Sequence, residues 1–131
     1  MENTRIFPAV LVFILLLSSC EKEGPGLTGV VINELMAVNS TIAADQNGEY
    51  DDWIELFNLK PATVDLTGFY LSDSKTIRSK WQFPYGTSIS GNGYLIIWAD
   101  KDTSQTGLHA NFKLSSAGEN LILSNQDLNL F

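Results

Sequence analysis

The sequence has only one cysteine, Cys20, and only one histidine, His109, among its 131 residues. A single cysteine excludes an intrachain disulfide. A zinc site is disfavoured as well, because such sites draw most of their ligands from several cysteines and histidines. We therefore interpret His109 as a loop residue rather than as a metal ligand or a member of a catalytic triad.

Basic residues are also scarce. The sequence has 8 lysines and arginines against 15 aspartates and glutamates, which gives a formal net charge of -7. A negative charge of this size repels a phosphate backbone unless the basic residues cluster, and here they are scattered. The composition therefore predicts no nucleic-acid partner.

No apolar run in the sequence is long enough to span a membrane. The longest, Ile6–Leu17, has twelve residues, whereas a spanning helix needs about 20. The run follows Arg5 and precedes two serines and Cys20, which is the pattern of a secretory signal. We predict a signal peptide over residues 1–19.

The segment Leu17-Ser18-Ser19-Cys20 resembles the bacterial lipobox, whose cysteine is diacylated and becomes the first residue of the mature protein. The resemblance implies that Cys20 is the lipidation site and the membrane anchor. The alternative is an ordinary cleavage site that has a cysteine beside it by coincidence.

Residues 20–29 are predicted to be the acylated cysteine and a flexible tether, because the segment after Cys20 has three glycines, one proline and no apolar period. The charged cluster that follows Cys20 is similar to the export signals of lipoproteins in Bacteroidetes-like bacteria. We therefore expect an exported protein, lipid-anchored to the bacterial outer membrane and exposed at the cell surface.

The segment Asp51–Asn58 is predicted to be a central strand. Ile54 and Leu56 lie on one face of it, and Trp53, Glu55 and Phe57 lie on the other, so both faces are largely apolar. Such a strand is stable only inside a sandwich, with cover on both sides. We expect Trp53 in the core; the alternative is a sugar-stacking platform formed with Trp81 and Trp98.

Helix signals are almost absent after the leader, and short β-rich segments recur between turn-forming residues. The further expected strands are Val30–Met36, one kinked or two short strands within Val64–Asp73, Lys80–Phe83, Tyr94–Ala99, Asn111–Leu114 and Glu119–Ser124. In the first of these, Glu34 is expected on the same face as Val30, Ile32 and Met36. The Ser90–Gly93 segment carries an Asn-Gly pair, which favours a tight hairpin turn.

These strands predict an all-β domain over residues 30–131, an immunoglobulin-like antiparallel β-sandwich, with a lipoprotein signal peptide before it. The 44% hydrophobic content is sufficient for one such core. A new alternating run begins at Leu128 and stops at Phe131. We therefore expect the sandwich to be truncated at its C-terminus.

Several motifs of this domain occur together in one order. They are Val31-Ile32-Asn33-Glu34, Asp52-Trp53-Ile54-Glu55-Leu56-Phe57-Asn58, Leu66-Thr67-Gly68-Phe69-Tyr70-Leu71-Ser72-Asp73, Phe83-Pro84, Tyr94–Ala99, Phe112-Lys113-Leu114 and Gly118-Glu119. Together they resemble a bacterial lamin tail domain from about Val30 to the last residue. The resemblance implies an immunoglobulin-like sandwich without catalytic activity. The nuclear-lamina role of animal lamins does not transfer, because the sequence lacks their coiled-coil rod.

Bacterial domains of this family occur on secreted or surface proteins, often beside nucleases, phosphoesterases or spore-coat-protein-H-type kinases. The resemblance therefore implies a cell-surface module, not an enzyme, that binds a protein or glycan ligand or acts as a scaffold. The alternative is an N-terminal accessory module of a larger surface enzyme whose catalytic domain is absent from this chain.

Five oxygen-bearing side chains gather between residues 45 and 52, and oxygen ligands are those that calcium prefers. They are Asp45, Asn47, Glu49, Asp51 and Asp52. The spacing differs from an EF-hand, because Gly48 holds the fourth place instead of the sixth and the final glutamate is missing. We interpret the segment as a solvated turn and expect no cofactor, with a calcium site as the alternative.

Glu34 and Glu55 each lie in an expected strand among apolar neighbours. Two carboxylates in one cleft could act as a general acid and base. We instead expect structural roles, in which each glutamate bonds to backbone amides, pairs with Lys80 or Arg78, or lies at an exposed margin of the sheet.

Overall fold

The computed structural model describes residues 29–130 of the chain. The predicted signal peptide, Cys20 and nearly all of the tether lie outside these residues. The described part consists of strands, turns and loops without a helix, as the sequence predicts. No helix in this range has the length and apolarity needed to cross a bilayer.

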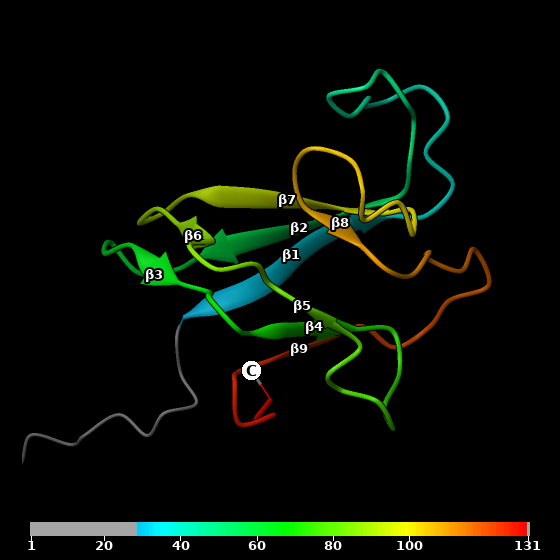
Figure 1. Ribbon diagram of the computed structural model, residues 1–131. Coiled ribbons are helices and arrows are strands. Elements are labelled where there is room, and N and C mark those ends of the chain that lie inside the picture. The colour runs from blue at the N-terminus through cyan, green and yellow to red at the C-terminus, as the bar shows by residue number, and fades with distance from the viewer. Residues whose placement is uncertain (1–28, 131) are drawn as a thin grey trace, which may run out of the picture.

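Nine strands form three sheets (Figure 1). The strands are β1 (Val30–Met36), β2 (Trp53–Asn58), β3 (Val64–Asp65), β4 (Tyr70–Ser72), β5 (Trp81–Gln82), β6 (Ser88–Ile89), β7 (Tyr94–Ala99), β8 (His109–Ala110) and β9 (Ile122–Ser124). The largest sheet has the order β1-β2-β7-β8, a second has the order β5-β4-β9, and β3 pairs with β6 in a short ribbon. All pairs are antiparallel except β7 with β8, which is parallel.

The four-stranded and three-stranded sheets form two layers, and the β3-β6 ribbon lies at one end of them (Figure 1). Ile54, Leu56 and Ile97 of the larger sheet and Leu71 and Leu123 of the smaller sheet belong to one buried apolar cluster. Burying a side chain of this size stabilises a fold by roughly 1.5–3 kcal/mol. The predicted all-β sandwich is therefore confirmed, with one parallel pair that the sequence did not indicate.

A β-bulge in β1 reverses the side on which its last residues lie. Ile32 pairs with Leu56 and Glu34 pairs with Glu55, so Asn33 has no residue opposite it. Because one extra residue shifts the period-two alternation, Glu34 lies on the side opposite to Ile32. The expectation that Glu34 and Met36 share a face with Val30 and Ile32 is therefore wrong.

Several predicted elements differ in extent. The segment Val64–Asp73 contains two strands, β3 and β4, because Gly68 takes a positive φ of 76° between them. The predicted Asn111–Leu114 strand is wrong, since this segment has only an isolated bridge between Lys113 and Asp100. The Asn111 side chain bonds to the Lys80 carbonyl instead of extending a ladder.

The Ser90–Gly93 segment forms a turn, with the Gly93 amide donating to the Ser90 carbonyl at 3.0 Å. The turn is not a hairpin, because it connects β6 and β7, which belong to different sheets. Asn58 holds this crossing: its side-chain amide donates to the carbonyls of Ala62, Ile89 and Ser90.

The alternating run that starts at Leu128 does not form a regular strand within the described residues. Leu128 has a positive φ of 63°, and the Asn125 side chain accepts hydrogen bonds from the amides of Asp127 and Asn129. These contacts turn the chain back, so that only an isolated bridge joins Leu130 to Ser124. The truncation of the domain stays a prediction.

Candidate functional site

The outer face of the four-stranded sheet, on the side away from the core, carries a row of apolar side chains. Val31 pairs with Phe57 and Phe57 pairs with Tyr94, so the three lie side by side across β1, β2 and β7. The rings of Phe57 and Tyr94 stack with centroids 4.6 Å apart. Tyr94 is nevertheless 61% exposed, and Val31 is exposed as well. Within residues 29–130, the smaller sheet lies over the opposite face of the four-stranded sheet and not over this one (Figure 1).

The next row on the outer face is acidic. Glu34 and Glu55 are direct partners across β1 and β2, and Ile96 of β7 follows Glu55. Glu34 is exposed and Glu55 is half-buried. The bulge residue Asn33 donates a hydrogen bond of 2.7 Å from its side-chain amide to Glu55 Oε1. Two like charges thus lie together on one side of the sheet, which the predicted alternation of β1 did not reveal.

The expected partners of these glutamates are bonded elsewhere. Lys80 binds Asp73, with its Nζ 2.6 and 2.7 Å from the two carboxylate oxygens. Arg78 donates from Nη1 to the Leu128 carbonyl. The expected pairing with Lys80 or Arg78 is therefore wrong, and the expected position on an exposed part of the sheet holds for Glu34.

The three tryptophans are buried. Trp53 and Trp98 are direct partners on the outer face and are only 8% and 7% exposed. Trp81 belongs to the core cluster and packs edge-on against Phe83, with ring centroids 4.8 Å apart. Burial of all three confirms the structural interpretation and removes the sugar-stacking platform. The Trp53 Nε1 atom is buried without a hydrogen-bond partner in the described part of the chain.

The acidic segment brings together three of its five predicted calcium ligands. One carboxylate oxygen from each of Asp45, Glu49 and Asp51 lies within 4.8 Å of the others. Asp52 does not join them, because its Oδ1 accepts the amides of Val38 and Asn39. Asn47 contributes its backbone amide, which donates to Asp45 Oδ1, and its side chain is exposed.

The charges in this cluster affect one another. Burial raises the pKa of the Asp51 carboxyl above its ordinary value, and the negative charges of Asp100, Glu49 and Asp45 raise it further. Lys113 acts in the opposite direction. Asp45 is buried, so the interpretation of the whole segment as a solvated turn is wrong for this residue.

Asn39 organises the loop that presents the acidic cluster, and sequence reasoning missed it. Its buried side chain donates to the carbonyls of Ala43 and Asp51 and accepts the amide of Ile42. Asparagine commonly bonds to nearby backbone in this way, but a single Asn in a polar loop gives no signal of burial. Asn39 therefore fixes the two ends of the loop relative to each other.

The family comparison agrees with the strands and motifs above. The family model of the Lamin Tail Domain matches residues 25–130. The chain belongs to the lamin tail domain family. Domains of this family have an immunoglobulin-like fold and are generally non-catalytic. Comparisons with curated proteins and with solved structures found no match.

In this lamin tail domain His109 is a buried strand residue, so its interpretation as a loop residue is wrong. His109 Nδ1 lies 2.6 Å from Asp100 Oδ2, and Nε2 lies 3.2 Å from the Thr106 carbonyl. Because both ring nitrogens are occupied, neither can activate a nucleophile. The pair instead connects β8 to the loop that leaves β7.

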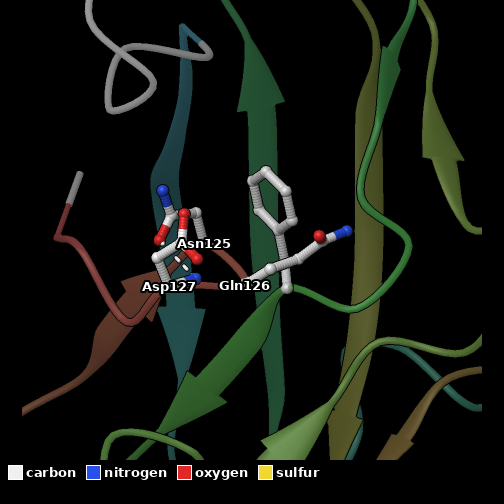
Figure 2. A pocket seen from close by; sticks show the side chains of 4 residues that line it. Asn125, Gln126 and Asp127 are labelled. Carbon is white, nitrogen blue, oxygen red and sulfur yellow. Dashed lines mark hydrogen bonds between the residues drawn. The ribbon is translucent and has the colours of Figure 1, made fainter.

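The lamin tail domain also has a pocket of about 240 Å³ beside the C-terminal turn, lined by Phe69, Asn125, Gln126 and Asp127. Figure 2 shows Asn125 and Asp127 close together on this turn. Gln126 donates from Nε2 to the Thr67 carbonyl at 2.7 Å. These polar groups hold the turn against the sandwich, so the pocket has no converging reactive groups.

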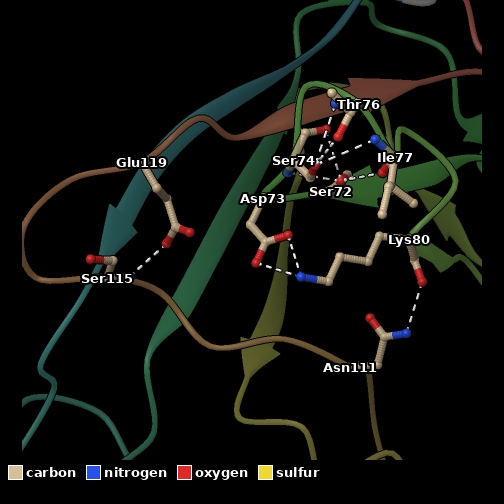
Figure 3. A network of polar contacts seen from close by, with 9 residues as sticks. All are labelled: Ser72, Asp73, Ser74, Thr76, Ile77, Lys80, Asn111, Ser115 and Glu119. Carbon is tan, nitrogen blue, oxygen red and sulfur yellow. Dashed lines mark hydrogen bonds and ion pairs between the residues drawn. The ribbon is translucent and has the colours of Figure 1, made fainter.

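A second polar network of the lamin tail domain lies where β4, the central strand of the smaller sheet, ends (Figure 3). Ser72 donates from its hydroxyl to the Ile77 carbonyl, and Lys80 bridges to Asp73. Asn111 donates to the Lys80 carbonyl from a distant segment of the chain. The members bond mainly to one another and thereby hold the 73–80 loop, which is a structural role.

Proposed function

We propose that this lamin tail domain is a lipid-anchored, non-catalytic module on the surface of a bacterial outer membrane, and that it binds a protein partner. The observation that carries this proposal is the row of exposed Val31, half-buried Phe57 and exposed Tyr94 on the outer face of the sheet. Contiguous apolar side chains on a surface commonly mark an interaction site. We call these three residues the outer row.

The charge beside the outer row indicates the chemistry of the partner. Glu34 and Glu55 form a negative pair directly beside it, and within residues 29–130 no ion pair neutralises either one. A complementary surface on the partner would present apolar side chains flanked by lysine or arginine. Opposite charges on the two surfaces favour their association in the correct orientation. A protein is preferred to a glycan, because the tryptophans that would have stacked on sugars are buried.

The anchor rests on the leader. An apolar run too short to span a membrane ends at Leu17, and two serines separate it from Cys20, the only cysteine. The nine residues that follow, 21–29, reach at most roughly 30 Å when extended. That reach would keep the domain near the membrane while leaving its outer row accessible.

A photo-crosslinking experiment tests the proposed surface. Benzoylphenylalanine is placed at position 94 of the full chain in intact cells, and at position 85 as the matched control. Both positions hold an exposed tyrosine, and Tyr85 is 96% exposed in a loop away from the outer row. We expect a discrete crosslink to one exported protein from position 94, absent from position 85 and lost with Glu34→Lys.

Three outcomes contradict the proposal. Equal crosslinks from positions 94 and 85 would indicate contact by collision only. A crosslink that persists with Glu34→Lys would remove the acidic pair from recognition. A product at position 94 whose added mass is removed by glycosidase would assign the outer row to a glycan.

A further inference from the structure

The acidic cluster is held in place by the backbone around it. Asp45 Oδ1 accepts the amides of Asn47 and Glu49, each at 2.8 Å, and the Asp45 amide donates to the Glu49 carbonyl. These bonds fold residues 45–49 into a tight turn. The turn brings Glu49 back beside Asp45, and Asp51 follows close to both. The chain thus places three negative groups together, and the salt bridges among the described residues involve none of them.

Asp45 has one carboxylate oxygen without a bonding partner among the described residues. Its side chain is more than nine-tenths buried, and its second oxygen, Oδ2, is fully buried without a hydrogen-bond partner in the described part of the chain. The two oxygens of a carboxylate are bonded to the same carbon. Oδ2 therefore lies close to the cluster even if Oδ1 is the Asp45 oxygen that lies within 4.8 Å of the Glu49 and Asp51 oxygens. A buried carboxylate oxygen without a donor is energetically unfavourable. A bound cation would remove that cost.

A second loop adds another oxygen from far along the chain. Gln105 donates from Nε2 to Glu49 Oε2 at 2.6 Å, across 56 positions of sequence. Its carbonyl oxygen, Oε1, is buried and has no partner in residues 29–130. The same two loops approach each other again where Gly107 faces the Gln46 side chain. Figure 1 shows both loops on the outer side of the four-stranded sheet, away from the smaller sheet.

We propose that Asp45, Glu49 and Asp51 bind a calcium ion, with Gln105 Oε1 as a further oxygen from the second loop. All the available donors are oxygen atoms, which calcium and other hard cations prefer. Calcium accepts six to eight ligands in irregular geometry, whereas magnesium requires a near-ideal octahedron. The ion joins the loop before β2 to the loop after β7. This inference does not depend on the protein partner proposed above.

Thermal unfolding of the full chain, purified in a mild detergent and stripped with a chelator, tests the site. Millimolar calcium chloride is expected to raise Tm by several degrees, because a ligand that binds only the folded state stabilises it. Calorimetric titration with calcium chloride is expected to show one site per chain. Sodium chloride at the same ionic strength controls for charge screening.

Two variants localise the effect. Asp51→Asn removes a ligand whose side chain makes no hydrogen bond in the described residues, so the variant is expected to fold and to lose the calcium-dependent rise in Tm. Asp127→Asn is the matched control, since it removes one exposed carboxylate at a distant turn and is expected to keep the full rise.

The proposal is overturned if calcium produces no rise in Tm and no binding heat in the unsubstituted chain. It is also overturned if sodium chloride alone produces the same rise, or if Asp51→Asn responds as strongly as Asp127→Asn. If Asp51→Asn fails to fold, Glu49→Gln replaces it, because Glu49 is exposed and a glutamine still accepts from Gln105.

Discussion

Glu34 on β1 and Glu55 on β2 lie directly opposite each other, so two carboxylates are neighbours on the outer face of the sheet. The bulge at Asn33 creates this arrangement and then supports it, because the Asn33 amide bonds to Glu55. Like charges at directly opposed positions destabilise a sheet. Glu34 faces solvent, and Tyr94 on the same face of the sheet is exposed. The proposed recognition of a positively charged partner would account for a pair that costs stability at this position.

Neutralising one member of this pair should stabilise the isolated domain. We expect Glu34→Gln to raise the free energy of unfolding by about 0.2–1 kcal/mol, because the repulsion across β1 and β2 is removed. Urea denaturation at low salt measures the change, and the gain should shrink at high salt. Asp127→Asn removes one negative charge elsewhere and should give no comparable gain. Equal effects of both substitutions would show that net charge alone is responsible.

Acylation of Cys20 can be tested directly. Metabolic labelling with a fatty-acid analogue should mark the chain, and Cys20→Ser should abolish the label and release the protein from the membrane fraction. Two acyl chains would hold the protein at the membrane, because each buried CH₂ contributes about 0.8 kcal/mol and stable attachment needs two chains. A mature protein that retains an unmodified cysteine at position 20 would disprove the anchor.

Two glycines separate steric from conformational effects. A Cβ at Gly91 would lie 1.9 Å from the Pro61 carbonyl oxygen. Gly91→Ala therefore forces the backbone at residue 91 away from the backbone at Pro61. We expect a loss of about 3 kcal/mol or more. Gly86 has a φ of 81° and open space around it, so Gly86→Ala should cost only about 1 kcal/mol. Urea unfolding compares the two, and similar losses would contradict the predicted clash.

The sequence predicted the long strands well and the short ones poorly. β1 and β7 have the predicted ends, because each is a β-rich segment that begins directly after a glycine. The two residues of β8, by contrast, gave no pattern of their own, and neither did its parallel pairing. The phase of β1 was also missed, since nothing local marks Asn33 as the residue that bulges.

The candidate cation site was predictable only in part. The density of acidic residues from Asp45 to Asp52 is visible in the sequence. The burial of Asp45 and the approach of Gln105 are not, because both depend on how two loops 56 residues apart fold over the same sheet. Long-range contacts of this kind leave no periodic signal in a single sequence.

Asp65 should contribute to stability in a pH-dependent manner. Hydrogen bonds from the Thr67 side chain and backbone lower the pKa of Asp65 below its usual value of 3.8. The stabilisation is therefore present above pH 3.8 and is lost as the pH falls through the lower pKa of the folded state. Asp65→Asn should be less stable than the unsubstituted chain at pH 6, and the difference should narrow at lower pH. A constant difference across that range would contradict the assignment.

Trp53 offers the sharpest test of how the outer face is built. Trp53→Ala should lower the free energy of unfolding by about 3–5 kcal/mol, because a large buried aromatic is lost together with its packing. Trp53→Phe should cost less, since it keeps a ring and also removes the Nε1–H group, which is buried without a partner. Urea denaturation of both variants, with Tyr85→Ala as an exposed aromatic control, gives the comparison. A loss below about 1 kcal/mol for Trp53→Ala would place the indole at the surface and restore the sugar-stacking alternative.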